Sequence, residues 1–261
     1  MKALHTAASG MMAQELNVEV ISNNIANMRT TAFKRQRADF QDLLYENLRR
    51  TGATTSESGT IVPSGIAIGG GVKTAATPRI MSQGDITMTE KELDVAIRGE
   101  GFFRVRLPDG RTAYTRDGSF ERDSVGQLVT VEGYVIEPGI TIPEDARGIS
   151  INSEGLVQAF VSTESDPVDL GTIDLARFVN PAGLDALGEN LFVETPSSGT
   201  EQTGRANEDG FGSLQQGYLE QANVNPVSEI SDLIAAQRAY EMNSRVISAA
   251  DEMMQSTTNI T

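Results

Sequence analysis

The C-terminal run from Val227 to Met254 places the strongest constraint on the fold, because its apolar residues keep a helical spacing over the whole stretch. They form two rows. The first row is Leu233, Ala236, Tyr240, Ile247, Ala250 and Met254, with Asn243 as its polar member. The second row is Ala235, Ala239, Met242, Val246, Ala249 and Met253. At about 100° per residue the rows lie roughly 110° apart and merge into an apolar arc of about 200°, whereas a surface helix needs only about 100°.

The N-terminal residues predict a matching helix from about Ala3 to Asn27. Its apolar positions recur in steps of four and three, with Leu16 and Val20 on the opposite side. They are Ala7, Met11, Val18, Ile21, Ile25 and Met28. Such a helix is roughly 37 Å long, so the two ends of the chain can pair along most of their length.

Pairing still leaves apolar surface on both helices. Each exposed Leu, Ile, Val or Met forgoes about 1.5–3 kcal/mol of burial, so we expect neighbouring copies to cover these ends. We also expect the ends to be poorly ordered without those copies. The alternative is an intramolecular helical hairpin that forms one side of a core.

The residues that we predict to make assembly contacts lie on these apolar arcs. They are Met11, Val18, Ile21, Ile25, Leu233, Tyr240, Val246, Ile247 and Met253. We expect Asn24, Asn27 and Asn243 to be buried polar contacts that set the register.

Charge and composition exclude several classes of protein. The chain has 36 acidic and 21 basic residues and a formal charge of −15, which disfavours non-specific binding to nucleic acid. It has no cysteine, and therefore no disulfide, thiol catalysis or thiolate metal site. Polar residues interrupt the first 20 positions, so we expect no secretory signal, and no apolar run is long enough for membrane insertion.

Between the terminal helices the chain changes character twice. We expect the basic run from Phe33 to Arg37 to lie on a solvated face. The apolar residues from Phe40 to Leu48 predict either a short amphipathic helix or an extended arm. Gly, Thr and Ser dominate from Thr51 to Gly71, which indicates a projecting or linking segment.

From Val72 to about Glu194 the apolar period is two, which predicts a β-rich domain. A hairpin at Pro108-Asp109-Gly110 is one of its turns. We expect the polar, Gly-rich stretch from Pro196 to Gly212 to be the return path, and Pro226 to begin the last helix. The predicted class is α+β: long terminal helices paired as a coiled-coil-like unit, an inserted β-rich domain and an extended arm.

We predict no catalytic, cofactor-binding or metal-binding residue. Gly99-Glu100-Gly101 lacks the third glycine and the helix of a dinucleotide loop, and it is better explained as a bend between strands. His5 is the only histidine, which excludes a two-histidine metal site. Asp109, Asp117 and Asp123 lack the spacing of a calcium loop. A carboxylate pair for glycoside cleavage would need a pocket to which nothing in the sequence points.

Several stretches resemble the axial proteins of the bacterial flagellum, which form its rod and hook. The similar stretches are Ser22-Asn23-Asn24-Ile25-Ala26-Asn27 with Thr30, Thr31, Phe33 and Lys34; Leu93 to Ile97 with Gly99, Gly101, Phe102 and Phe103; Tyr114 to Phe120 with Gly126, Leu128-Val129-Thr130 and Gly133-Tyr134; Gly217 to Glu220; Asn223 to Asn225; and Gln237 to Glu241 with Asn243-Ser244. One departure is Ala32, where the family pattern has Gly, so we expect a less free turn before Phe33. Residues 136–212 match less specifically.

The length and the extra segment from Glu46 to Gly70 resemble the distal-rod members, because the hook members lack that stretch. This resemblance implies a helical tubular homopolymer in the periplasm that transmits torque from proximal rod proteins to the hook protein, inside the P-ring and L-ring proteins. It also implies secretion by the flagellar export apparatus, without a cleaved signal. Residues 1–30 and 222–261 would be the helical assembly domain, 31–71 the arm that lies between subunits and stiffens the rod, and 72–221 the outer β domain.

Two alternatives remain open from the sequence. The first is a proximal rod or hook subunit of the same family. The second is a secreted carbohydrate-active or adhesive β protein whose helices merely fold back.

Overall fold

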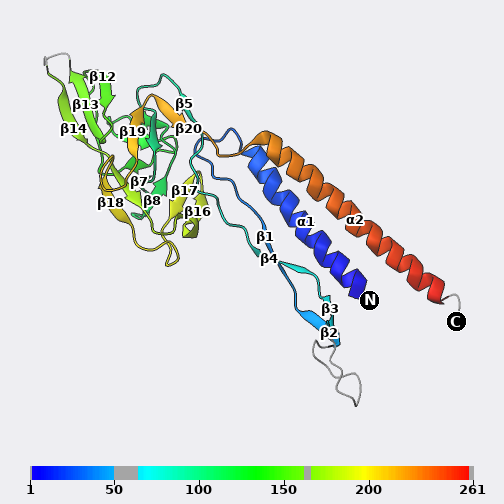
Figure 1. Ribbon diagram of the computed structural model, residues 1–261. Coiled ribbons are helices and arrows are strands. Elements are labelled where there is room, and N and C mark those ends of the chain that lie inside the picture. The colour runs from blue at the N-terminus through cyan, green and yellow to red at the C-terminus, as the bar shows by residue number, and fades with distance from the viewer. Residues whose placement is uncertain (1, 50–63, 162–165, 259–261) are drawn as a thin grey trace. The chain divides into compact units, whose positions relative to one another are not determined.

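A computed structural model describes residues 2–49, 64–161 and 166–258, which form two compact units (Figure 1). The helical unit comprises Met1–Ala26, Gln36–Pro78 and Asn225–Thr261. The β unit comprises Asn27–Arg35 and Arg79–Val224.

These boundaries differ from the predicted ones. Residues 31–35 belong to the β unit, where the Ala32 N–H donates to the Glu220 carbonyl (2.8 Å) and the Ile80 N–H donates to the Arg35 carbonyl (2.9 Å). Residues 72–78 belong to the helical unit, because strand β4 (Val72–Ala76) pairs with strand β1 (Asp39–Asp42).

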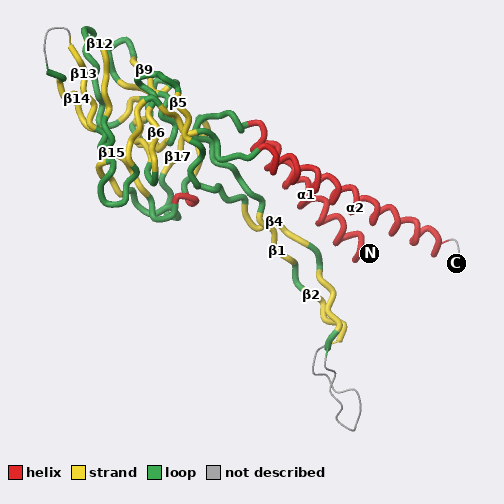
Figure 2. Tube along the Cα trace, turned by 45° about the horizontal axis from the view of Figure 1, so that its top comes forward, coloured by secondary structure: helices red, strands yellow, loops and turns green. Residues whose placement is uncertain are grey.

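Two long helices run antiparallel in the helical unit, with both chain ends at the same end of the pair (Figures 1 and 2). They are α1 (Lys2–Ala26) and α2 (Pro226–Thr258), and they pack along each other. The Asn225 side chain caps α2 by accepting a hydrogen bond from the Val227 N–H (3.0 Å), and Pro226 occupies the first helical position. Both predicted helices are confirmed. Within the described residues, no helix is long and apolar enough to span a membrane.

A narrow β ribbon completes the described part of the helical unit. It consists of two antiparallel pairs, β1 (Asp39–Asp42) with β4 (Val72–Ala76) and β2 (Tyr45–Arg49) with β3 (Ile66–Gly69). Of the two alternatives for this region, the extended arm is correct and the amphipathic helix is wrong. Residues 50–63, most of the stretch rich in Gly, Thr and Ser, lie outside the described range.

The β unit is built from short antiparallel strands. Its main sheet has the order β16-β17-β8-β7-β11-β10-β9, with β15 joining β7 and β18; β12-β13-β14 form a second sheet, and β19-β6 and β20-β5 are separate pairs. The strands are β5 (Ile86–Met88), β6 (Val95–Arg98), β7 (Phe102–Arg106), β8 (Thr112–Thr115), β9 (Phe120–Arg122), β10 (Leu128–Thr130), β11 (Val135–Ile136), β12 (Ala146–Ile151), β13 (Leu156–Val161), β14 (Val168–Thr172), β15 (Asp174–Arg177), β16 (Asp185–Gly188), β17 (Leu191–Val193), β18 (Gln202–Arg205), β19 (Ser213–Gln216) and β20 (Tyr218–Glu220), and a 3-10 turn covers Pro181–Gly183. The α+β class is confirmed.

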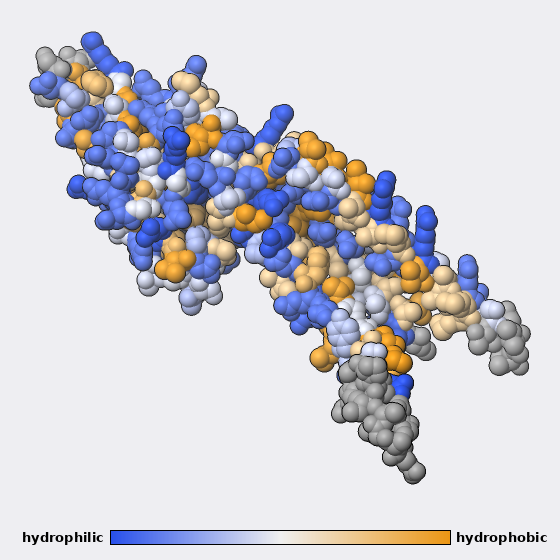
Figure 3. Space-filling view, viewed as in Figure 1, coloured by the Kyte–Doolittle hydropathy of each residue, from blue (hydrophilic) through white to orange (hydrophobic). Residues whose placement is uncertain are grey.

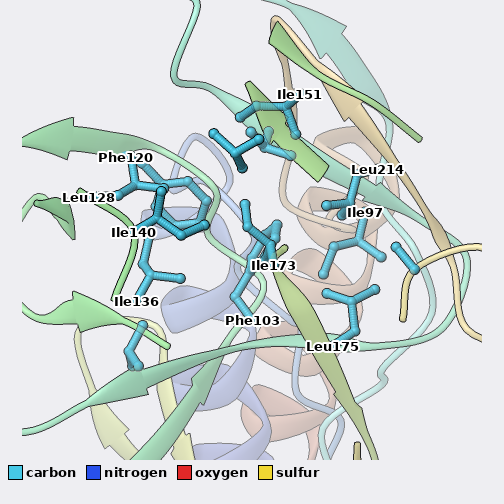
Figure 4. Close-up of a cluster of buried hydrophobic side chains, with 14 of the residues drawn as sticks. Ile97, Phe103, Phe120, Leu128, Ile136, Ile140, Ile151, Ile173, Leu175 and Leu214 are labelled. Carbon is cyan, nitrogen blue, oxygen red and sulfur yellow. The ribbon is translucent and has the colours of Figure 1, made fainter. Parts of the chain in front are cut away.

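Strand β7 lies in the centre of the main sheet and is buried on both faces. Successive side chains of a strand point to opposite faces, so Phe103 enters one apolar cluster and Phe102 another. The larger cluster brings together Phe103, Phe120, Ile136 and Leu175 from four strands (Figure 4). The smaller one stacks Phe102 edge-to-face on Phe178 and Phe192.

Three strands lie beyond the stretch of period two, which was predicted to end at about Glu194. Strand β18 lies within the expected return path from Pro196 to Gly212, for which the sequence predicts no particular strand. Strands β19 and β20 are the other two. The hairpin at Pro108-Asp109-Gly110 is confirmed, since the Gly110 N–H donates to the Leu107 carbonyl (2.9 Å).

Gly118 allows a close backbone contact in the β unit. The Val95 N–H donates to the Gly118 carbonyl (3.0 Å), and a Cβ atom at position 118 would overlap with the Val95 carbonyl oxygen. The backbone conformation of Gly118 is ordinary, so the close approach, and not a left-handed turn, requires glycine.

We predict that Gly118→Ala lowers the free energy of unfolding of the β unit by about 3 kcal/mol or more, because the overlap involves backbone atoms that cannot rotate away. Gly148→Ala is the matched control, since its nearest neighbour would be the Glu92 Oε1 atom at 4.0 Å. Urea unfolding followed by circular dichroism measures both variants. Equal stability of the two variants would contradict this explanation.

Candidate assembly surface

Asn24 is a buried polar contact between the two helices. It is 1 % exposed, and its side-chain N–H groups donate to the Gln36 carbonyl (2.9 Å) and to Glu229 Oε2 on α2 (3.1 Å). Its side-chain oxygen accepts from the Gln36 N–H (2.9 Å). One asparagine thus joins the end of α1, the start of the arm and the first turn of α2.

A second contact between the helices occurs where Gly10 faces Asn243. A Cβ atom at Gly10 would lie 2.9 Å from the Asn243 Nδ2 atom, so the missing side chain makes room for the amide. Fourteen residues separate Gly10 from Asn24, and fourteen separate Glu229 from Asn243. The Asn24–Glu229 and Gly10–Asn243 contacts, about 21 Å apart along the helices, therefore define the same antiparallel register.

The apolar residues buried between the helices are mostly small. They are Ala7, Ala13, Val20 and Ile21 on α1, and Ala236 and Ala250 on α2. Small residues let two helix backbones approach closely, but they bury little apolar area.

Most of the large apolar residues of α2 are left outside the pair. Val227, Ile230, Ile234, Tyr240, Met242, Val246, Met253 and Met254 are all between 41 % and 79 % exposed, and on α1 Met12 is 72 % exposed. Hydrophobic colour accordingly follows the helical unit on the face shown in Figure 3. An ordinary helical hairpin would place its large residues inward, so the size order here indicates that further partners cover the outer face.

The predicted assembly residues divide between these two surfaces. Ile21 and Asn24 are buried, and Met11, Val18, Ile25, Leu233, Asn243 and Ile247 are half-buried. Tyr240, Val246 and Met253 are exposed. Asn27 lies in the β unit, where its side chain accepts a hydrogen bond from the Thr30 hydroxyl (3.2 Å). The role of all twelve in assembly stays a prediction.

The β ribbon adds a further exposed apolar surface to the helical unit. Leu44, Leu48 and Ile66 are 93 %, 60 % and 52 % exposed. The ribbon is attached to α1, because the Val72 N–H donates to the Ser9 hydroxyl (3.3 Å) and Lys2 pairs with Glu46.

A buried ion network in the β unit was missed by the sequence prediction. The carboxylate of Glu220 accepts hydrogen bonds from Lys34 Nζ, from Arg116 Nε (2.8 Å) and from the Gly84 N–H (2.9 Å). All three charged residues are at most 5 % exposed. The expectation of a solvated basic run is therefore wrong for Lys34, although Arg37 is exposed.

Carbonyl oxygens stabilise the excess positive charge of this network. Lys34 donates to the Ser82 carbonyl (2.9 Å), and Arg116 donates to the carbonyls of Gly101 and Gly99 (both 2.9 Å). The bend at Gly99-Glu100-Gly101, predicted from the sequence, is thus held by a guanidinium group.

The network shifts the pKa values of its members. Burial by itself would raise the pKa of Glu220, but the charges of Arg116 and Lys34 and the hydrogen bonds to the carboxylate hold it below its usual value of 4.5. Burial lowers the pKa of Lys34; Glu220 offsets this shift only in part, and Arg116 adds to it. One signal could have revealed the network: Lys34, Arg116 and Glu220 stand in three separate stretches of the family resemblance.

Ala32, the one departure from the family pattern, adopts a backbone conformation that suits glycine. Its φ is 57°, in the left-handed region that favours glycine, and it is buried.

Three family models match this chain. Residues 4–34 match "Flagella basal body rod protein", residues 96–159 match "Flagellar hook protein FlgE/F/G D1 domain", and residues 215–260 match "Flagellar basal body rod FlgEFG protein C-terminal". The matches cover α1, the central strands of the β unit and α2. They define the class as the rod and hook proteins of the flagellum.

Curated relatives narrow the class. The chain is 55 % identical to flagellar basal-body rod protein FlgG of Caulobacter vibrioides, over 100 % of this chain and 99 % of the relative. It is 48 % identical to that of Borreliella burgdorferi, over 97 % and 96 %, and 37 % identical to that of Bacillus subtilis, over 100 % and 99 %. The chain therefore belongs to the FlgG family of flagellar basal-body rod proteins. It is a structural subunit of the rod, so the alternative of a secreted carbohydrate-active or adhesive protein is wrong.

We predict that Asn24→Asp destabilises the helix pair by about 3 kcal/mol, because it places a second carboxylate beside Glu229 in a buried site. Asn23→Asp is the control, since its side chain is exposed. Thermal loss of helical circular dichroism measures the effect. If both variants melt like the native chain, Asn24 does not hold the helices together.

We predict that Glu220→Gln lowers the stability of the β unit by about 3–5 kcal/mol at neutral pH, because it leaves two buried cations without a counter-charge. Lys91→Met is the control: its ion pair with Glu121 (3.6 Å) is exposed and is expected to contribute at most about 1 kcal/mol.

The loss of stability in Glu220→Gln should depend on pH in a defined direction. The folded-state pKa of Glu220 is lowered, so its contribution is present above its unfolded-state pKa near 4.5 and is lost as the pH falls through the folded-state value. Urea unfolding should therefore show that the difference in the free energy of unfolding between the native protein and Glu220→Gln becomes smaller below pH 4.5. A gap that is independent of pH would rule out the charge as its cause.

Proposed function

We propose that this subunit forms the distal section of the rod as a helical tubular homopolymer. In this polymer α1 and α2, paired in the manner of a coiled coil, line the inner wall, and the β unit belongs to the outer domain. Residues 1–30 with 222–261 act as the assembly domain, and the ribbon within residues 31–71 lies between subunits.

The observation that carries this proposal is the size order of the helix pair: the buried apolar residues are mostly alanines, and most of the large apolar residues of α2 are exposed. Covering each large side chain with a neighbouring subunit contributes about 1.5–3 kcal/mol. Several such residues on each subunit would repeat along the polymer, and their sum can offset the loss of translational freedom on assembly.

We propose the following position in the flagellum. The polymer receives torque from proximal rod proteins, passes it to the hook protein and turns inside the P-ring and L-ring proteins. The flagellar export apparatus delivers the subunit to the periplasm. Family membership and the names of the basal-body rod relatives support this arrangement. Within it, the exposed residues of the ribbon supply a contact between subunits that stiffens the shaft.

We predict that Met242→Glu and Val246→Glu each abolish polymerisation of the purified chain, because a carboxylate in a buried apolar contact is strongly unfavourable. Val125→Glu is the control, since Val125 is similarly exposed but lies in a turn of the β unit. Sedimentation and negative-stain electron microscopy detect the polymer. Straight polymers from the Met242 and Val246 variants would contradict the proposed role of α2.

A further inference from the structure

The helix pair carries two surfaces of opposite charge on different sides. One is a groove between α1 and α2, with a volume of about 380 Å³. Val18 and Tyr240 supply its apolar part, and Glu15, Glu19 and Glu241 supply its charge, with Gln237 completing the lining. We call it the acidic groove.

The other surface is the exposed side of α2, which contains two arginines within its apolar residues. Met242 follows Arg238 by four residues and precedes Arg245 by three, so these three side chains share one side of the helix. We call this side, with Val246 and Met253, the arginine face. Arg238 and Arg245 are the only basic residues of α2, and both are exposed.

Within the part of the chain that the structure describes, neither surface satisfies its charges. Glu15 and Glu19 stand four residues apart on α1, where like charges repel each other. Glu241 and Arg245 have the spacing of an intrahelical pair, yet among the described residues no ion pair joins them, and neither Arg238 nor Arg245 contacts a carboxylate.

The two surfaces complement each other in charge and in apolar character. Around the α2 axis, Tyr240, Gln237 and Glu241 point about 40–160° away from Arg238 and Arg245, so one chain cannot insert its own face into its own groove. A contact between different surfaces of identical chains is heterologous, and it propagates into an open assembly when the rotation does not close. A guanidinium group can also stack on the exposed ring of Tyr240.

We propose that the arginine face of one subunit docks into the acidic groove of a second copy of this chain, with Arg238 and Arg245 pairing with Glu15, Glu19 and Glu241. This inference rests on the proposed homopolymer and specifies which surfaces meet. The apolar residues supply most of the affinity, and the charges select the register and direction of the contact.

The test uses two charge-reversal variants of the full chain, Arg238→Glu/Arg245→Glu and Glu15→Lys/Glu19→Lys. Each variant alone should raise the critical concentration for polymerisation by about tenfold or more, because like charges then face each other across the contact. Arg122→Glu/Arg205→Glu is the control: it reverses two exposed charges in the β unit and should polymerise like the native chain.

Mixing the two variants distinguishes charge pairing from damage to the fold. In an equimolar mixture, the acidic face of the arginine variant can dock into the basic groove of the glutamate variant. The unchanged arginine face of the glutamate variant can dock into the unchanged acidic groove of the arginine variant. We therefore expect polymerisation to return to within a few-fold of the native level. Circular dichroism of each variant before mixing reports its helix content.

The outcomes separate this inference from the proposed function. If the native chain and all variants polymerise equally, the docking of these two surfaces is wrong, while the homopolymer stands. If each variant fails and the mixture also fails, the pairing is likewise wrong. If the native chain forms no polymer under any condition, the proposed function fails, and this inference fails with it.

Discussion

The carboxylate of Glu220 joins three segments of the chain that are far apart in sequence. Lys34 comes from the stretch that follows α1, Arg116 from the middle of the β unit, and Glu220 itself from the strand before α2. A charge buried without partners costs several kcal/mol, so Lys34 and Arg116 both require Glu220, and Glu220 requires their positive charge. The β unit is therefore complete only when residues from both ends of the chain have joined its central strands.

This dependence has a consequence for the helices. The Ala32 N–H donates to the Glu220 carbonyl, so the segments that lead out of α1 and into α2 lie side by side within the β unit. Asn24 then joins the end of α1 to Glu229 in the first turn of α2, and Asn243 packs on Gly10 farther along.

Polar contacts fix which residues of the helices meet, and small residues fix how closely they meet. Most of the large apolar residues of α2 are left exposed. A protein that functioned as a monomer would gain stability by the reverse arrangement, and this supports the proposal that other subunits cover this surface.

The sequence predicted some parts of this arrangement better than others. The helices were predicted correctly because periodicity over 25 or more residues is a strong signal, and the central strands because alternation and turn residues coincide. Strands β18, β19 and β20 were missed because they are short or mostly polar and pair by backbone hydrogen bonds, which leave little pattern in the side chains. Lys34 was assigned to the surface because a basic run usually is solvated, and nothing local to residue 34 reveals a carboxylate 186 residues later.

The sequence by itself determined that both ends are helical, that their apolar arcs are too wide for one partner helix, and that a β-rich region separates them. These properties depend on residues close together in the chain, where periodicity is visible. Only the tertiary structure decided which part of each arc is buried, which polar residues set the register, and where three buried charges meet. Those features depend on distances between atoms that are remote in sequence, and such distances exist only once the chain has folded.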